Sequence, residues 1–415
     1  MPSAATASTP APGPGPSVVL YGQIHQPSRL RRYRIYEIGN RSDYFDEDLD
    51  REVFLKVADK CYRPALALVQ KLVDQHHGAF RMALAVSGSA LDQMQRWAPD
   101  LIDALRGLAA GGCIEFLAET YYHSLSFVFD REEFDHQLDA HLEALQRLLG
   151  VTPTTFRNTE LVYSDEVARH VAARGFSVVL AEGADHVLEG RPPGCVYEAA
   201  GSAGTRLLLR HARLSDDIAF RFSNRSWSHW PLTAPRYADW LASAGGAGEV
   251  VGLFLDFESF GEHQWAETGI FDFLDALPAE ARARGVGFLT PAEAAATLPS
   301  AGELSVPAYT SWADAERDLS AWLGNPLQRA VAKAVYEVGG DIRASGDPEL
   351  LHDWRRLTTS DHLYYLATKH GPDGDVHRYF SPHASQADVY IALMNVLNDV
   401  ALRVVDERRR VPAAA

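Results

Sequence analysis

The sequence predicts an α/β fold in which a barrel of parallel strands is followed by a helical region. Short apolar runs alternate with amphipathic helical patterns over residues 17–300, which implies parallel strands with helical crossovers, in a barrel or an open doubly wound sheet. Acidic residues follow strands that lie far apart in the chain. This favours the barrel, because closure brings the carboxyl ends of all its strands to one mouth. Beyond residue 300 the patterns are helical.

The composition is that of a globular protein with excess negative charge. The chain has 415 residues, of which 47% are hydrophobic, enough for one large core and a second region. Its net charge of −16, without clustered Lys and Arg, disfavours nucleic acid and anionic membranes as partners, so neutral substrates fit better. The three scattered cysteines match neither a disulfide framework nor a zinc site, and we expect a cytoplasmic location.

Residues 1–16 consist almost wholly of Ala, Pro, Ser, Thr and Gly, which predicts a disordered tail rather than a signal peptide. No apolar run approaches the roughly 18 residues of a membrane-spanning helix. We therefore expect three parts: this tail, a catalytic barrel over residues 17–300, and a helical region over residues 301–410 that contributes to the cleft.

The first predicted strand, residues 17–21, leads into His25, Gln26 and Pro27. Proline cannot continue the hydrogen-bond ladder of a strand, so His25 and Gln26 should lie at its carboxyl end. In α/β barrels that end forms the mouth of the active site. We therefore predict that both side chains belong to the site.

Glu115 and His123 are candidates of lower rank. Glu115 lies inside a predicted strand, where a buried carboxylate needs either a partner or a task. A structural salt bridge would explain it as well as substrate contact would. The elements expected in this part of the chain are helices at residues 49–76 and 89–108 and strands at residues 80–86 and 113–117.

Glu160 is the first strong candidate. It follows a short strand that begins near Thr155, and Ser164 after it is typical of a helix N-cap. The unit is therefore a strand, a carboxylate and a helix. A cation beside a carboxylate lowers its pKa, so Arg157 or His25 would keep Glu160 ionised.

Asp256 is the second. The continuous apolar run at residues 250–255 is typical of a strand buried on both faces, and it stops on this carboxylate. Glu258, Glu262 and His263 follow closely, a density of polar groups that solvated surface hardly explains. Burial and the neighbouring acidic groups would raise the pKa of Asp256.

Glu160 and Asp256 at one rim would supply what glycoside hydrolysis requires. One carboxylate must stay ionised as the nucleophile, while the other holds a proton for the leaving oxygen. Residues 213–229 should form a loop whose tryptophans either line a sugar cleft or anchor the loop. The other elements expected in the barrel are helices at 131–149, 165–174 and 271–284, strands at 176–181, 206–209 and 286–290, and a loop or hairpin at 190–204.

In the helical region, Trp312, Asp361 and His362 lie in polar or aromatic clusters that packing alone does not explain. We predict that Trp312 covers a sugar face and that Asp361 accepts hydrogen bonds from sugar hydroxyls. Alternatively, Trp312 wedges between barrel and helices. Residues 302–307 are typical of a linker, and helices are expected at 312–323, 326–338, 348–369 and 385–407.

Five spaced motifs resemble those of the glycoside hydrolase family 57 α-amylases, in particular their amylase-like branch. They are His25-Gln-Pro27, Gly112-Cys-Ile-Glu115, Arg157-Asn-Thr-Glu160, Asp256-Phe-Glu-Ser-Phe-Gly-Glu-His263 and Ser311-Trp-Ala-Asp314. Each motif is weak alone, but their order and spacing are specific. The resemblance covers residues 17–399.

The resemblance implies an irregular seven-stranded barrel followed by a helical bundle. It also implies a retaining enzyme that cleaves α-1,4-glucans such as starch, glycogen or maltodextrins without a metal or other cofactor. By motif position Glu160 is the nucleophile and Asp256 the acid/base. The residues expected to bind substrate are His25, Gln26, Glu115, His123, Arg157, Glu258, His263, Trp312, Asp361 and His362.

Other functions are weighed against this one. A metal-dependent deacetylase or mannosidase typically pairs His residues at helical spacing, and no two of the 16 His here are four residues apart. A catalytically silent protein would bind glucans without turnover. A glucan transferase or branching enzyme would use the same carboxylate pair with a sugar acceptor. The sequence does not separate that case from hydrolysis, nor does it indicate the oligomeric state.

Overall fold

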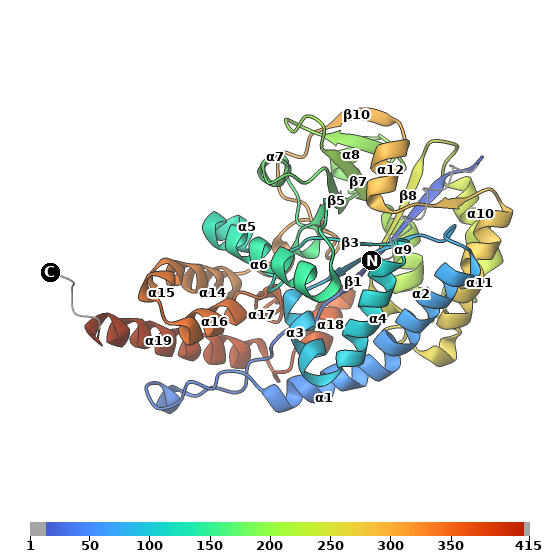
Figure 1. Cartoon of the computed structure of the whole chain (residues 1–415). Helices are drawn as coiled ribbons and strands as arrows, with labels where there is room; N and C mark the ends of the chain where they lie inside the picture. Colours follow the sequence, from blue (N-terminus) through green and yellow to red (C-terminus); the bar gives the residue numbers. More distant parts are fainter. Residues whose placement is uncertain (1–13, 411–415) are drawn as a thin grey trace, which may run out of the picture.

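In the computed structural model the described residues are 14–410, with side chains described as far as residue 406. Figure 1 shows a sheet surrounded by helices and, beside it, a group of C-terminal helices that includes α14–α19. The predicted fold class, a mixed α/β region with a parallel-rich sheet followed by helices, is confirmed.

Seven strands of the sheet pair in parallel with their neighbours in the order β4–β5–β7–β8–β1–β2–β3. A further parallel bridge joins Ala118, beyond the end of β3, to Phe156 of β4. The pairings thus link all seven strands in one sheet, and its closure into the predicted seven-stranded barrel stays a prediction. These strands are β1 (Ser17–Ile24), β2 (Met82–Val86), β3 (Ile114–Phe116), β4 (Thr155–Arg157), β5 (Val178–Glu182), β7 (Arg206–Arg210) and β8 (Val250–Asp256).

The register of the central strands aligns their carboxyl ends. Gln23 near the end of β1 pairs with Asp256 at the end of β8, and Ile24 pairs with Val86 at the end of β2. All residues of β1 and β2 are buried, as expected of parallel strands covered on both faces. The residues that follow these three strands therefore start from one edge of the sheet.

Three further strands lie outside this path. β6 (Val196–Ala199) pairs antiparallel with β7, which confirms the hairpin alternative for residues 190–204. β9 (Gly287–Phe288) pairs with β1, and β10 (Ser300–Leu304) pairs with β6. The predicted linker at residues 302–307 is therefore wrong in its first part, because backbone hydrogen bonds place those residues in the sheet.

The helices around the sheet agree broadly with the predicted pattern. The predicted helix at residues 49–76 contains a π-helical turn, η2 (Ala58–Tyr62). The other helices here are α1 (Glu47–Val57), α2 (Arg63–Gln75), α3 (Gly88–Trp97), α4 (Pro99–Ala110), α5 (Ser126–Phe129), α6 (Arg131–Leu149), α7 (Asp165–Ala173), α8 (Asp185–Leu188), α9 (Ala212–Ala219), α10 (Ala234–Ser243), α11 (Ile270–Ala283) and α12 (Pro291–Thr297).

Two local predictions in this part need correction. The loop expected at residues 213–229 begins as α9, and Trp227 packs against Trp240 with ring centroids 6.1 Å apart, which favours the anchoring alternative for this tryptophan. Ser164 does occupy the N-cap position of α7, but its side chain makes no capping hydrogen bond. By contrast, the side chain of Asp130 caps α6 by accepting from the backbone N–H of Glu133.

The helical region packs around its own apolar core, which includes Trp322 and Trp354. The helix expected at residues 312–323 is confined to its last turn, and the one expected at 348–369 is broken into two. The helices are α13 (Ser320–Leu323), α14 (Pro326–Glu337), α15 (Gly339–Ser345), α16 (Pro348–Leu357), α17 (Ser360–Tyr364), α18 (Gly371–Phe380) and α19 (Gln386–Arg410).

The predicted tail lies mostly outside the described residues. Its last residues do not fit the prediction of disorder, because Gly15 donates to the carbonyl of Gly285 and Gly287 donates to that of Pro16. Within residues 14–410, no helix is both long and apolar enough to cross a bilayer. The three cysteines form no disulfide.

Candidate active site

Glu160 lies in a short 3-10 turn, η3 (Thr159–Leu161), that follows β4. Its backbone is left-handed with φ 56°, which residues other than glycine rarely adopt and which recurs at functional sites. One carboxylate oxygen lies 2.9 Å from Nε2 of His123, and the other accepts from Nε1 of Trp312 at 2.7 Å. The side chain is still 23% exposed, which leaves it open to a ligand.

The environment of Glu160 favours its ionised form. Burial raises its pKa, but the hydrogen bond and charge of His123, with smaller effects of Arg157 and Trp312, outweigh burial and bring the pKa below its usual value. We predicted Arg157 or His25 for this effect. His123 contributes more to the lowered pKa than either, because it hydrogen-bonds the carboxylate of Glu160 and the other two do not.

Asp256 is the last residue of β8, as predicted, and is half-buried. Its carboxylate has no hydrogen-bond partner among residues 14–406. Burial, followed by the negative charge of Glu160, raises its pKa to about 6. The predicted direction is therefore correct, but the neighbouring negative charge that matters most is Glu160 rather than Glu258 or Glu262.

His123 connects Glu160 to a second carboxylate, Glu119, which is fully buried. Nδ1 of His123 lies 2.9 Å from Oε2 of Glu119, whose other oxygen accepts from Gln23 Nε2 at 2.8 Å. Burial lowers the pKa of His123, but its bonds to Glu119 and Glu160 raise it to about 9. The imidazole is thus placed between two carboxylates.

His25 packs flat on His123, with ring centroids 4.0 Å apart and planes inclined by 20°. Its Nδ1 lies 2.8 Å from the hydroxyl of Ser87, and its Nε2 lies 3.0 Å from Oδ2 of Asp361 on α17. Burial and the charge of His123 lower the pKa of His25, so this ring is neutral at neutral pH. The pair joins the first strand to the helical region.

Glu258 contacts the backbone of His25. It accepts from the hydroxyl of Tyr62 at 2.5 Å and from the backbone N–H of His25 at 3.4 Å. Burial and the charge of Asp256 raise its pKa to about 8, so it holds a proton at neutral pH. Gln26 supports this arrangement by donating to the Tyr62 hydroxyl at 3.1 Å. Tyr62 comes from the π-helical turn, a distortion that is frequent at functional sites.

Two arginines lie close to the ring of Trp312. The guanidinium carbons of Arg157 and Arg210 are 5.0 and 5.7 Å from its ring centroid, within the range of cation–π attraction. Arg157 is fully buried. Within residues 14–406 its guanidinium makes no hydrogen bond, and the carboxylate nearest to it is that of Glu119, at 3.9 Å. Trp312 also contacts Glu160 directly, through the hydrogen bond from its Nε1. Its predicted packing on a sugar face stays a prediction.

The helical region contributes side chains to this group. Burial raises the pKa of Tyr364, at the end of α17, and so do the charges of Asp314, Glu160 and Asp256. Asp361 of the same helix bonds His25, as described above. Side chains from β1, β4, β8 and α17 are thus brought together.

Glu115 is not part of this group. One oxygen accepts from the hydroxyl of Thr155, and the other accepts from the backbone N–H of Ala292 at 2.8 Å, in the first turn of α12. An anion at a helix N-terminus is stabilised by the free N–H groups there. Glu115 is therefore held by these two hydrogen bonds and not by the salt bridge to Arg that was expected as the structural alternative.

Two predicted histidines also lie elsewhere. His362 lines a small cavity among α14, α16 and α17 in the core of the helical region. His263 is packed against Phe380 of α18, with ring centroids 5.8 Å apart. Burial lowers the pKa of both rings to about 4, so both are neutral at neutral pH. Neither bonds Glu160 or Asp256.

Three residues of the site were missed by our sequence analysis. Glu119 follows the strand at residues 113–117, while Glu182 and Arg210 are the last residues of β5 and β7 and bond each other at 3.2 Å. All three are charged groups at or just beyond the end of an apolar run. The rule that identified Asp256 would have found them.

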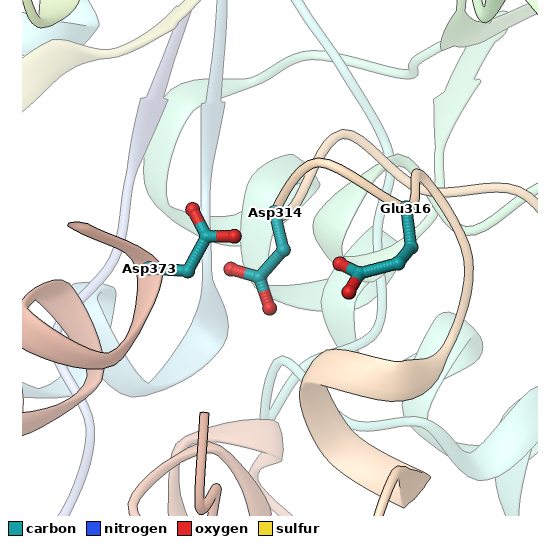
Figure 2. A group of neighbouring side chains, drawn as sticks. All are labelled: Asp314, Glu316 and Asp373. Carbon is teal, nitrogen blue, oxygen red and sulfur yellow. The ribbon is translucent and has the colours of Figure 1, made fainter. Parts of the chain in front are cut away.

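An acidic cluster beside the site contains Asp314, Glu316 and Asp373, whose carboxylates face one another in Figure 2. The ammonium group of Lys369 lies 2.7 Å from Asp314 and 2.6 Å from Glu316, and Nε2 of His377 lies 3.1 Å from Asp314. The ammonium group of Lys369 thus offsets part of the negative charge of the cluster. These bonds fasten the loop after β10 to α18.

The site combines two carboxylates whose pKa values are pushed apart. Glu160 is held ionised by cationic and polar donors, whereas Asp256 is held closer to its protonated form by burial and by Glu160. Such a pair provides a nucleophile and a proton donor at the same pH. Acid-assisted displacement at a glycosidic carbon uses a pair of carboxyl groups of this kind.

Comparisons with known proteins agree with this chemistry. A family model described as glycosyl hydrolase family 57 matches residues 19–307. A protein of Methanocaldococcus jannaschii named "Putative alpha-amylase" is 38% identical over 391 residues, which are 91% of this chain and 82% of that protein.

Solved structures with a similar fold include a family 57 branching enzyme from Thermococcus kodakaraensis, with a TM-score of 0.68, 13% identity and coverage of 94% of this chain and 91% of the enzyme. The α-amylase AmyC of Thermotoga maritima has a TM-score of 0.60, 12% identity and 95% coverage of both chains. The 4-α-glucanotransferase of Thermococcus litoralis has a TM-score of 0.60 and 16% identity, covering 96% of this chain; this chain spans 60% of that enzyme. At these identities the likeness is one of fold.

Proposed function

This chain belongs to glycosyl hydrolase family 57, and on that premise we propose that it is a retaining enzyme that cleaves α-1,4-glucosidic bonds, with Glu160 as nucleophile and Asp256 as acid/base. The observation that carries the assignment is the separation of the two pKa values, downward for Glu160 and upward for Asp256. The name of the Methanocaldococcus protein and those of the enzymes with a similar fold support an α-glucan as substrate.

In the first step, an oxygen of Glu160 attacks the anomeric carbon while Asp256 gives its proton to the departing glycosidic oxygen. A glycosyl ester on Glu160 results, and Asp256 becomes ionised. Each Glu160 oxygen already accepts one hydrogen bond, which orients the carboxylate and leaves a lone pair for attack.

In the second step, water attacks the ester as Asp256 takes up a proton, and Glu160 leaves as a carboxylate. The charge that had raised the pKa of Asp256 is absent while the ester exists, so Asp256 is then a group that ionises readily. The same residue therefore serves as acid in one step and as base in the next.

Sugar hydroxyls would be bound by the polar groups around the pair. His25, Asp361 and Glu258 present hydrogen-bonding groups from the first strand, the helical region and the loop after β8. We propose that the helical region forms one wall of the cleft, because barrel ends alone would leave a glucan largely in water.

Maltoheptaose should be cleaved to shorter maltodextrins, and the first product should have the α-configuration. The reason is that two displacements at one carbon restore its configuration. In retaining enzymes the two carboxyl groups are roughly 5–5.5 Å apart, and we expect this separation for Glu160 and Asp256. Proton NMR of the nascent product measures the anomer.

A β-anomer would contradict the role of Glu160 as nucleophile. Products longer than maltoheptaose would identify a transferase that uses the same pair, and shorter products alone would identify a hydrolase. Maltodextrin binding without any turnover would reject the proposal in favour of a silent binding protein.

The pH dependence of kcat/KM should be bell-shaped. Asp256 must be protonated to assist the first step, so the rate should fall as pH rises through about 6. Glu160 must be ionised, so the rate should also fall at acidic pH, below the usual range of a glutamic acid. A profile of kcat/KM from about pH 3 to pH 9 measures both limbs. A kcat/KM that does not change with pH across neutrality would contradict the assignment of Asp256.

A further inference from the structure

His123 is bonded in a way that fixes its charge. Its Nδ1 and Nε2 each lie 2.9 Å from a carboxylate oxygen, of Glu119 and Glu160 respectively. An ionised carboxylate can only accept hydrogen bonds, so each ring nitrogen must carry a proton. The ring is therefore an imidazolium that joins the two carboxylates.

Glu119 is the inner end of this chain of bonds. Its side chain is fully buried, and a buried carboxylate is costly unless cations and donors surround it. It has Gln23 at 2.8 Å, His123 at 2.9 Å and Arg157 at 3.9 Å. Gln23 in turn accepts from the hydroxyl of Tyr21 within β1. Glu119 is thus held in place by the strand at the centre of the sheet.

A purely structural ion pair would explain Glu119 less well. Buried ion pairs contribute little to stability, because desolvation offsets their attraction. The hydrogen bonds that run from Gln23 through Glu119 and His123 also do not end in the core, since they end at Glu160, which is partly exposed at the site. His25 further holds the imidazolium by stacking on the ring at 4.0 Å.

We propose that Glu119 is a positioning residue that acts through His123: it keeps the imidazolium protonated and aimed at Glu160, and so keeps the nucleophile ionised and oriented through both displacements. This inference rests on the proposed function, in which Glu160 is the nucleophile. Glu119 itself would not touch the substrate.

The need for Glu119 is clearest at the glycosyl ester. When Glu160 forms its bond to the anomeric carbon, it loses its charge, and the proton of Asp256 leaves on the departing oxygen. Of the two carboxylates that bond His123, only Glu119 is then an anion, and it retains the proton on the ring. When water cleaves the ester, Glu160 returns as a carboxylate to an imidazolium that is still charged.

The titratable and charged groups around His123 act in both directions. Glu119 and Glu160 favour its protonated form, whereas burial opposes it. His25 carries its own partner, Asp361, on its far side. The charge of His123 is also coupled to His25, Asp256 and Asp361. Arg157 and His141 act on Glu119 instead.

Glu119→Gln tests the proposal, because it keeps the shape and removes the charge. We expect kcat/KM on maltoheptaose to fall roughly 10- to 100-fold, the effect of one hydrogen bond to a charged group. The acidic limb of the pH profile should move upward by about one to three pH units. His123→Gln should move that limb in the same direction. A merely structural role would change the melting temperature and leave the limb in place.

The matched control is His141→Gln. His141 is also fully buried, and it bonds the backbone N–H of Glu119 at 3.2 Å and the carbonyl of Val86 at 2.9 Å without reaching Glu160. Its loss should lower the melting temperature while the acidic limb stays unchanged. An unshifted limb in folded Glu119→Gln would overturn the proposal.

Nitrogen-15 NMR of labelled histidines provides a readout that does not depend on turnover. His123, assigned by its absence from His123→Gln, should remain an imidazolium at neutral pH in the unmodified protein. A neutral His123 there would overturn the proposal even if Glu119→Gln did not fold. If the unmodified protein cleaves no glucan, the proposed function fails, and this measurement still tests the link between Glu119 and His123.

Discussion

Glu160→Gln is expected to reduce the rate of glucan cleavage by on the order of 10⁴-fold or more, the scale on which loss of a catalytic nucleophile acts. The amide is nearly isosteric with the carboxylate, so it should keep the bond from Trp312 but cannot form the glycosyl ester. Steady-state kinetics on maltoheptaose measure the loss. The melting temperature should change little, because the side chain is partly exposed.

Glu166→Gln is the control for this substitution. Glu166 is exposed in the first turn of α7, and its one ion pair with a described residue is that with Arg131. Such surface pairs contribute about 0–1 kcal/mol to stability, so rate and stability should both be retained. Wild-type turnover by a folded, verified Glu160→Gln protein would reject Glu160 as nucleophile.

Asp256→Asn is expected to lower the rate on maltoheptaose by about 10²- to 10⁴-fold, the range of general acid–base catalysis. The loss should be smaller with a glucoside whose leaving group departs without protonation, since only the water-activated second step then needs Asp256. Comparison of the two substrates separates loss of the acid from general damage to the site.

An exposed aspartate provides the comparison. Asp272 lies in the first turn of α11, and Asp272→Asn should leave both rates unchanged. Equal losses on both substrates in Asp256→Asn would argue that this residue binds sugar rather than transfers protons. An anionic nucleophile such as azide, which needs no base, should partly restore turnover of the glycosyl ester in the true acid/base variant.

The two central carboxylates could be located from the sequence because their positions follow from local patterns. A run of buried apolar residues ends at Asp256, and the pairing of β8 with β1 confirms that it stands at a strand end. Glu160 comes three residues after the end of β4, in a turn. Their assignment as catalytic groups stays a prediction, which the two substitutions above would test.

The partners of these carboxylates could not be located in the same way. Trp312 was expected in a helix, because its segment has helical spacing, but the loop after β10 is fastened to α18 by Asp314 and His377. That loop places the indole N–H 2.7 Å from Glu160. Glu115 was considered for the site on the strength of its charge, yet its partners are Thr155 and the N-terminus of α12.

By itself, the sequence determined most of the order of strands and helices and the strand ends from which a site could be built. Hydrophobic periodicity is sufficient for this, because it records which face of each element is buried. Only the tertiary structure decided that His123 and Trp312 bond Glu160, that Glu119 bonds His123, and that the charge of Glu160 raises the pKa of Asp256. Hydrogen bonds and pKa values depend on groups a few ångströms away, and these groups come from segments that the chain brings together only when it folds.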